Sequence, residues 1–377
     1  MNWSSGIPLK SKTDLLAVGG ETKNTFALVK GNQLWKSGDN GNLEELDNLL
    51  RFERKIGAAL KKFELGPRRL LADLHPEYLS TKFAQDFCRR RNLPLEYIQH
   101  HHAHAASCAF ENNQTGKGIG VIFDGTGYGD DEKLWGGEFL IFDFRKFRRY
   151  AHLKYIPLVG GSKPIKEPWR LAVTWLYEIY GQRLGSLKID FVRRWPARKI
   201  SILMQMLDRQ INCPLASSMG RLFDAIAAII GIKNFAAYEA EAAVALEKSA
   251  AAQYPKRLKP YKFSLEKEAA GLIINPIPLF KAVIANLKSQ RPTTEIALKF
   301  HYAVAQMIKE VCLKIRRKEN LNRIFLSGGV FQNKILTQEA TGLLEGAGFK
   351  VFKNLTSPSD SSLSIGQAAI GAYRYSH

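Results

Sequence analysis

Several patterns are missing from this chain of 377 residues, and each absence removes a class of protein. No stretch of 18 apolar residues occurs, so no segment is expected to span a membrane. The four cysteines lie far apart and form no CxxC pair, which argues against a zinc finger or a thioredoxin-type site. The P-loop signature GxxxxGK[ST] is absent as well. The opening residues, MNWSSGIPLKSKTDLL, have no signal-peptide pattern, and with the few cysteines they predict a cytoplasmic protein without a membrane partner.

Acidic residues are scarce relative to basic ones. Lysine and arginine number 55 against 35 aspartates and glutamates, which gives a formal net charge of +20. Basic clusters stand at 89–91, 145–149, 193–199 and 316–318. This surplus favours an anionic partner such as nucleic acid, an acidic protein or a nucleotide, whereas the alternative is a solvated surface that serves solubility. Because the clusters are scattered and lack interleaved aromatic residues, nucleic acid is not the favoured partner.

Four histidines stand within Gln99–Ser107, which has the sequence QHHHAHAAS. On a helix, His100 and His104 share one face because they are four residues apart, and together they can hold one divalent cation. The glycine-rich segment Phe123–Gly129 follows, and Asp124 at the end of a predicted strand would add an oxygen ligand. We predict a metal site here; the alternatives are a solvated helix start or histidines bonded to core carbonyls.

A strand–turn–strand module followed by helical sequence occurs twice. The expected segments are 14–18, 25–29, 33–36 and 43–63 in the first copy, and 118–123, 134–142, 150–155 and 167–180 in the second. Duplication of this kind is typical of the actin-like ATPase fold, in which two lobes enclose a cleft and each presents a glycine-rich turn to phosphate. We therefore predict an α/β protein of this fold, with a first lobe at 1–115 and a second lobe with helical insertions at 116–377.

The remaining sequence is mostly helical in its periodicity. Helices are expected at 215–232, 236–252 and 293–318, strands at 323–326 and 346–352, and an exposed loop at 253–267. The segment Ser327–Asn333, SGGVFQN, follows one of these strands and precedes a helix. Paired glycines let backbone N–H groups approach a nucleotide, and the start of a helix favours negative charge. The alternative is an ordinary tight turn.

Two further segments carry cations that suit a phosphate. Gly160–Arg170, GGSKPIKEPWR, offers Lys163, Lys166 and Arg170 beside a proline-braced turn, and we predict catalytic roles for these three residues on an acidic leaving group. The alternative is a basic surface loop. Arg221 could reach a phosphate or could merely pair with Asp224 one helical turn later.

Seven stretches share the order and spacing of one family pattern: GGETKNTFAL (19–28), DLHPEYLST (73–81), QHHHAHAAS (99–107), FDGTGYGDDEKLWGGEF (123–139), GGSKPIKEPWRLA (160–172), SSMGRLFDAIAAIIGI (217–232) and LSGGVFQN (326–333). Along nearly its whole length the chain resembles the C-terminal carbamoyltransferase module of the hydrogenase maturation protein HypF, which is related to the tRNA threonylcarbamoyltransferases. The resemblance implies the actin-like fold. It also implies transfer of a carbamoyl group from carbamoyl-adenylate to the C-terminal cysteine of HypE, a step toward the cyanide ligand of nickel–iron hydrogenase.

The resemblance further implies two sets of site residues. The divalent metal ligands would be His100, His104, Asp124 and Asp360, and this donor set suits iron, zinc, manganese or magnesium. ATP, AMP or carbamoyl-adenylate would bind at the glycine-rich turns and the GRLFD helix. The predicted nucleotide-binding residues are Gly127, Gly220, Arg221, Asp224, Ser327, Gly328, Gly329 and Asn333.

The chain departs from the HypF pattern in three respects. The 377 residues contain no acylphosphatase domain, CxxC zinc module or adenylate-forming domain, so we expect a separate adenylate-forming protein to supply the adenylate. The family motif NDGG is SDSS at 359–362, and YEGQAA is YEAEAA at 238–243, where Glu241 replaces an amide. Both changes are expected to weaken nucleotide binding.

Two functional hypotheses remain. In the first, the chain is a carbamoyltransferase whose partners are a HypE-type acceptor and the adenylate-forming protein. In the second, it is a degenerate, non-catalytic nucleotide-binding subunit. A variant of the first is an enzyme that carbamoylates tRNA or a small-molecule hydroxyl. Retention of all four metal ligands favours an enzyme, and DLHPEYLST and WGGEF speak against tRNA although the basic charge would suit it.

Overall fold

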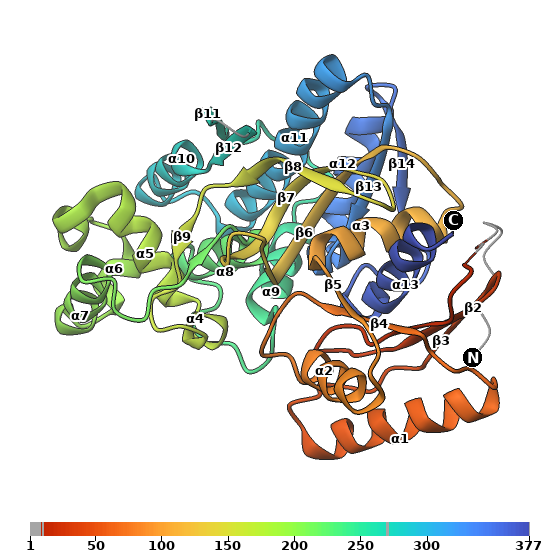
Figure 1. Cartoon of the computed structure of the whole chain (residues 1–377). Helices are drawn as coiled ribbons and strands as arrows, with labels where there is room; N and C mark the ends of the chain where they lie inside the picture. The colour runs from red at the N-terminus through yellow and green to blue at the C-terminus, as the bar shows by residue number, and fades with distance from the viewer. Residues whose placement is uncertain (1–8, 10, 269–270, 377) are drawn as a thin grey trace.

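The computed structural model describes residue 9 and residues 11–268 and 271–376. Its first sheet has five strands in the order β3-β2-β1-β4-β5 (Figure 1). Their bounds are β1 Leu15–Ala17, β2 Ala27–Lys30, β3 Gln33–Lys36, β4 Arg69–Asp73 and β5 Leu95–Ile98. β1 runs antiparallel to β2 and parallel to β4, and β4 and β5 are parallel. The three-stranded meander therefore continues into two parallel strands.

The second sheet repeats this topology. Its central strands are β6 Gly118–Tyr128, β7 Leu134–Phe142, β8 Phe147–Leu153, β13 Arg323–Ser327 and β14 Lys350–Lys353. The order β8-β7-β6-β13-β14 has the same antiparallel and parallel pairings as the first sheet. Further strands extend it: β9 Ile156–Pro157, β10 Leu215–Ala216, β11 Ser264–Glu268 and β12 Gly271–Asn275. The predicted duplication and the actin-like fold are thus confirmed.

Helices cover both faces of each sheet. Alternation along β1 sends Leu16 and Val18 toward α1 (Leu46–Lys62) and α2 (Leu79–Arg91), while Leu15 and Ala17 face the other way. Between the two sheets lie α3 (His100–Glu111) and α13 (Leu363–Arg374). The last helix of the chain thus packs on the first sheet (Figure 1). The far face of the second sheet is covered by α8 (Met219–Ile229) and α11 (Thr293–Glu319).

The remaining helices surround the second sheet. They are α4 Lys163–Lys166, α5 Trp169–Tyr180, α6 Asp190–Arg194, α7 Ala197–Asp208, α9 Glu241–Ala251, α10 Ile277–Lys288 and α12 Lys334–Glu345, with short 3-10 turns η1 Gly181–Ser186, η2 Gly329–Gln332 and η3 Asp360–Ser362. Several predicted bounds differ in detail. The helices expected at 215–232 and 236–252 begin only at Met219 and Glu241, and the first is preceded by the strand β10. The strand expected at 118–123 continues to Tyr128, the one expected at 346–352 begins at Lys350, and the loop expected at 253–267 ends in β11. Within the described residues, no helix combines the length and the apolar composition needed to cross a membrane.

Candidate metal and nucleotide site

The histidine segment forms the start of α3, as its spacing predicts. The side chain of Gln99 caps this helix by accepting a hydrogen bond from the backbone N–H of His102 at 2.9 Å. All twelve residues of α3 are buried between the two sheets. His100 and His104 therefore present their imidazoles on one face of a fixed helix.

Two aspartates approach this face from opposite sides. The pairing of β6 with β7 shifts between Phe123 and Gly127, so the segment that contains Asp124 leaves the regular ladder. Oδ1 of Asp124 accepts hydrogen bonds from the backbone N–H groups of Gly125 and Gly329. Asp360 opens η3, just before α13, and its Oδ2 accepts a hydrogen bond from the Thr22 hydroxyl at 3.2 Å. In each aspartate the other carboxylate oxygen is left for the histidines.

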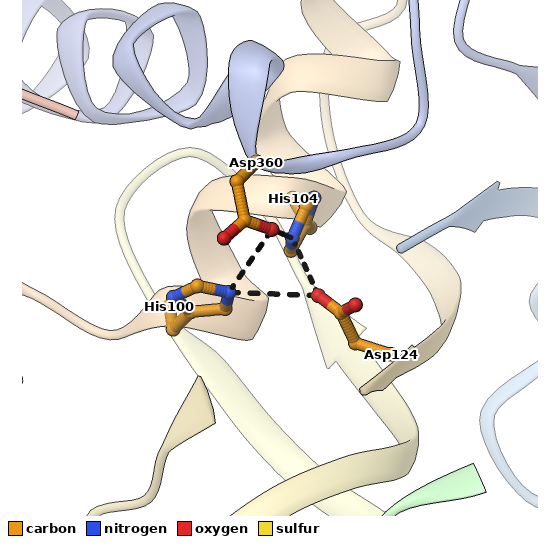
Figure 2. A group of neighbouring side chains, drawn as sticks. All are labelled: His100, His104, Asp124 and Asp360. Atoms are coloured by element: carbon orange, nitrogen blue, oxygen red, sulfur yellow. Dashed lines mark ion pairs between the residues drawn. The ribbon is translucent and has the colours of Figure 1, made fainter. Parts of the chain in front are cut away.

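The four side chains converge on one point (Figure 2). Nε2 of His104 lies 3.0 Å from Oδ2 of Asp124 and 3.7 Å from Oδ1 of Asp360. Nε2 of His100 lies 3.5 Å and 3.9 Å from the same two oxygens. Ligands bound at about 2.1 Å around a tetrahedral ion are about 3.4 Å apart, so these separations match those around a single metal ion.

The donor atoms also lack other partners. Nε2 of His100, Nε2 of His104 and Oδ2 of Asp124 are buried and have no hydrogen bond within the described part of the chain. Buried polar atoms without partners are costly, and two imidazoles with two carboxylates form a common ligand set for divalent ions. The residues present therefore fit a metal ion.

The histidines and carboxylates of the cluster stabilise each other's charged forms. Burial alone would lower the pKa of His100, but the nearby carboxylates, Asp73 foremost, raise it well above its ordinary value. Burial likewise opposes protonation of His104, yet Asp124 raises its pKa. Burial would raise the pKa of Asp124, and the two imidazoles instead hold it well below its usual range. Asp124 thus remains ionised and favours positive charge at this point.

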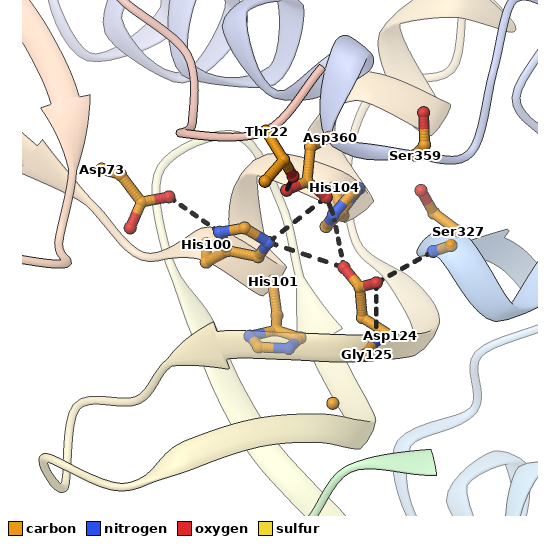
Figure 3. A network of polar contacts seen from close by, with 12 residues as sticks. Thr22, Asp73, His100, His101, His104, Asp124, Gly125, Ser327, Ser359 and Asp360 are labelled. Atoms are coloured by element: carbon orange, nitrogen blue, oxygen red, sulfur yellow. Dashed lines mark hydrogen bonds and ion pairs between the residues drawn. The ribbon is translucent and has the colours of Figure 1, made fainter. Parts of the chain in front are cut away.

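The cluster is supported by residues that the sequence analysis did not single out (Figure 3). Asp73, at the end of β4, holds Nδ1 of His100, and Thr22 holds Asp360. The ring of His101 lies beside that of His100, and its Nδ1 contacts Gln99. Asp73 is the last residue of β4 within DLHPEYLST, and an aspartate at a strand end was the sequence signal that could have identified it.

The SGGVFQN turn joins the cluster directly. Gly328 has φ +96°, and a Cβ there would lie 2.3 Å from the carbonyl oxygen of Phe123. Glycine is therefore required for the turn to pass so close to β6. The next residue, Gly329, donates its N–H to Asp124, while the Ser327 hydroxyl bonds Asn354 at 2.7 Å. The predicted strand–glycine–helix order is confirmed, and it places the turn at the edge of the metal cluster.

The GRLFD helix also adjoins the cluster. A Cβ on Gly220 would lie 2.9 Å from Cα of Gly125, so the start of α8 touches the residue after Asp124. Arg221 is buried and pairs with Asp224 at 3.0 Å, while its Nε has no hydrogen bond among the described residues. On β6, Gly127 lies against the rings of His100 and His101, where a Cβ would be 2.7 Å and 2.6 Å from ring carbons.

Other predicted site residues lie differently. Asn333 caps α12 through its carbonyl oxygen, and its amide faces Nε2 of His301, so both ends of the side chain are engaged. Lys163 and Lys166 are exposed on α4, and Arg170 is ion-paired with Glu167 beside the ring of Trp169. In the described chain, no hydrogen bond or ion pair links these three cations to the metal cluster. Their catalytic roles stay predictions.

The two motif departures cause no local conflict. Glu241 is ion-paired with Lys233 at 2.6 Å and accepts the N–H of Ala237, and the bond to Lys233 is the main cause that lowers its pKa. The Ser362 hydroxyl donates to the carbonyl of Ser359 at 3.0 Å, and neither Ser361 nor Ser362 has a positive φ. Both departures are therefore accommodated by their own contacts.

Comparisons with known proteins agree with this geometry. The family model "HypF Kae1-like domain" matches residues 10–111, and "Carbamoyltransferase, Kae1-like Domain, second subdomain" matches residues 120–367. The carbamoyltransferase HypF of Synechocystis is 33% identical over 98% of this chain and 49% of that protein. A "Carbamoyltransferase HypF homolog" of Cupriavidus necator is 31% identical over 95% of this chain and 91% of that protein.

Solved structures show the same fold. Full-length HypF in a phosphate- and nucleotide-bound form superposes with a TM-score of 0.91 at 34% identity, over 97% of this chain and 47% of that one. HypF of T. kodakarensis gives a TM-score of 0.88 at 28% identity, over 98% of this chain and 48% of that one. The chain thus spans about half the length of these structures and of the Synechocystis relative.

Proposed function

This chain belongs to the carbamoyltransferase HypF family, and we propose that it moves a carbamoyl group from carbamoyl-adenylate to the C-terminal cysteine of a HypE-type acceptor. The step would serve formation of the cyanide ligand of nickel–iron hydrogenase. The observation that carries the proposal is the convergence of His100, His104, Asp124 and Asp360 beside the SGGVFQN turn. A cation site next to a glycine-rich turn suits an acyl group activated by a nucleotide phosphate.

The proposed reaction balances without a nucleophile from this chain. The acceptor thiol loses its proton to solvent, and its sulfur forms a bond to the carbamoyl carbon. The bond between that carbon and the phosphate oxygen breaks, and AMP leaves with the electron pair. The products are a thiocarbamate on the acceptor and AMP, so the protein has to bind, orient and stabilise charge.

Each part of the site has a role in this proposal. A divalent ion held by the four-residue cluster would supply Lewis-acid stabilisation of the phosphate charge. Gly328 and Gly329 keep side chains away, so that the phosphate can approach the backbone between β13 and α12. Arg221 on α8, whose Nε is unpartnered, offers positive charge on the other side of Asp124. We assign Lys163, Lys166 and Arg170 to the departing AMP.

The adenylate would be made outside these 377 residues. The basic surface, with a formal net charge of +20, would favour association with acidic partners. Cytoplasmic localisation and the HypE-type partner remain part of the proposal and rest on the family relationship.

Mass spectrometry of the acceptor tests the proposal. The chain, an adenylate-forming protein, ATP, carbamoyl phosphate and the acceptor are incubated together, and the acceptor cysteine should gain about 43 Da, the mass of one carbamoyl group replacing hydrogen. An acceptor whose terminal cysteine is serine should gain nothing, and the His104→Ala chain should be inactive. A chain that binds metal and nucleotide but forms no adduct would instead be a non-catalytic subunit or an enzyme for another acceptor.

A further inference from the structure

One end of the second sheet lies far from the metal cluster. There the starts of the parallel strands β6, β13 and β14 meet the turn between β7 and β8 and the end of α11 (Figure 1). Asp124 stands six residues beyond the start of β6, which corresponds to about 20 Å along the strand. Whatever binds at this end therefore leaves the cluster free.

Basic side chains cover this end of the sheet, which we call the basic end. They are Lys117, Arg145, Lys146, Arg148, Arg316, Arg317, Lys318, Arg323 and Lys350. All are exposed except Arg316 and Arg323, which are partly buried.

Contacts within the structure join these residues into one surface. Arg323 donates to the carbonyl of Lys117 at 2.9 Å and is the register partner of Lys350. Arg148 reaches Glu319 at the end of α11, next to Lys318. Arg316 donates to the carbonyl of Ala347, just before β14. Four separate stretches of the chain thus contribute to the same basic end.

Carboxylates offset little of this charge. Glu319 is paired with Arg148 at 2.7 Å, and Asp143 accepts the backbone N–H groups of Arg145 and Lys146. Glu345 is the exposed acid at the edge of the surface. The basic end therefore keeps a strong positive field.

Exposed apolar side chains are missing from the basic end. In the described chain the large exposed hydrophobic residues lie elsewhere, for example Leu46 on α1, Ile202 on α7 and Phe235 before α9. Protein interfaces bury an apolar core, whereas interfaces with nucleic acid are more polar and more positively charged. Single strands require aromatic side chains for base stacking, and none is exposed here. This combination favours contact with the phosphate backbone of a duplex.

We propose that the basic end binds double-stranded nucleic acid through its phosphates, without sequence preference, on a face separate from the metal cluster. The proposal goes beyond carbamoyl transfer and does not depend on it. DNA and RNA duplexes offer the same phosphate chemistry, so both are used as probes.

The test uses fluorescence anisotropy with random-sequence 20-base-pair DNA and RNA duplexes between 50 and 200 mM salt. The variant R145E/K146E/R317E/K318E reverses four charges of the basic end. The control K61E/K62E/R89E/R90E reverses four exposed charges on α1 and α2, and both changes lower the formal net charge from +20 to +12 because each reversal removes two charges. The two variants thus differ only in where the charge is removed.

We expect the basic-end variant to bind at least about tenfold more weakly than the wild type at 100 mM salt. Its slope of log affinity against log salt should be smaller by about 3 to 4, since each lost phosphate contact removes about 0.9. The control should stay within about threefold of the wild type. A preference for RNA or for DNA would identify the duplex.

Three results would overturn the proposal. An equal loss of duplex affinity in both variants would show that binding depends only on net charge. No duplex binding by the wild type at 50 mM salt would also refute it, and binding of polyglutamate without binding of duplex would indicate an acidic protein instead. If circular dichroism shows the reversed variant to be unfolded, R145Q/K146Q/R317Q/K318Q is judged by the same criteria against the control K61Q/K62Q/R89Q/R90Q.

Discussion

Gly366 on α13 lies directly against Ala103 on α3, so close that a Cβ on Gly366 would stand 1.8 Å from the Ala103 carbonyl oxygen. This contact joins two helices that lie far apart in the sequence. It holds η3, and with it Asp360, beside His104, the residue that follows Ala103 in α3. The metal cluster therefore depends on a helix contact that only glycine permits.

Replacing Gly366 with alanine should separate the two helices. Overpacking of a tight core contact costs about 1–3 kcal/mol, so the free energy of unfolding in urea should fall by that amount. Metal affinity should fall as well, because Asp360 moves with α13. The matched control is Gly342→Ala on α12, where a Cβ meets nothing within 4 Å. Wild-type stability and metal content in Gly366→Ala would contradict the argument.

Asp73 should tune the metal site without touching the ion. Its Oδ2 lies 2.8 Å from Nδ1 of His100, and both side chains are fully buried. This bond fixes the tautomer that leaves Nε2 for a metal. Asp73→Asn keeps an acceptor but removes the charge, so metal affinity measured by titration with a chelator should fall about 10- to 100-fold. His104→Ala should lose more metal affinity than Asp73→Asn does. The ring of His102 faces the Asp143 carbonyl instead of the cluster, so His102→Gln should bind metal as the wild type does.

Replacing Ser361 and Ser362 with the glycines of the family motif should not tighten nucleotide binding. Ser362 is fully buried with its hydroxyl bonded to Ser359, and the Ser361 carbonyl accepts from the Thr25 hydroxyl. Restoring both glycines removes the bond from the Ser362 hydroxyl to Ser359 and frees the unfolded chain, so stability should drop by about 1–2 kcal/mol. AMP affinity measured by calorimetry should be unchanged. Tighter AMP binding would instead support the expectation from the family motif that the serines hinder the nucleotide.

Replacing Ala240 with glycine should stabilise the protein. It has φ +64° just before α9, a conformation that costs alanine about 1 kcal/mol or more, and the family motif YEGQAA has glycine at this position. Ala240→Gly should therefore raise the free energy of unfolding by about 1 kcal/mol. Ala243→Gly, within the same helix, should lower it by a similar amount. A loss of stability in both variants would show that the strain at Ala240 is compensated.

The sequence predicted the local parts of the site well and the long-range parts poorly. The spacing of His100 and His104 fixes their common face within one helix, and Asp124 directly follows the strand predicted at 118–123. Asp73 and Thr22 were missed, because their contacts with the cluster exist only after separate elements pack together. Asp360 was assigned through the family resemblance, since nothing local in SDSS indicates that α13 returns to the first sheet. Asn333 caps α12, and its nucleotide contact stays a prediction, because a helix cap and a nucleotide contact have the same sequence pattern.

Glu21 should make stability depend on pH. Its carboxylate is 7% exposed and accepts the N–H of Leu79 at 2.7 Å, and burial raises its pKa from 4.5 to about 6 although backbone N–H groups oppose the shift. The folded protein therefore holds the proton more tightly than the unfolded chain does. The contribution of this carboxyl group to the free energy of unfolding is fully present below pH 4.5 and is lost as the pH rises through 6. The total loss is about 2 kcal/mol.

The neutral variant Glu21→Gln lacks this titration and keeps an acceptor for Leu79. Urea unfolding of both proteins at pH 4 and pH 7.5 should show the wild type losing about 2 kcal/mol relative to Glu21→Gln over that interval. Titration of the remaining histidines and carboxylates affects both proteins alike and cancels in the difference. Glu53→Gln, on the exposed side of α1, is the control for the removal of one carboxylate. Parallel curves for Glu21→Gln and the wild type would mean that the Glu21 carboxyl is solvated in the folded state, and that the contact between the GGET turn and the start of α2 is looser than the structure shows.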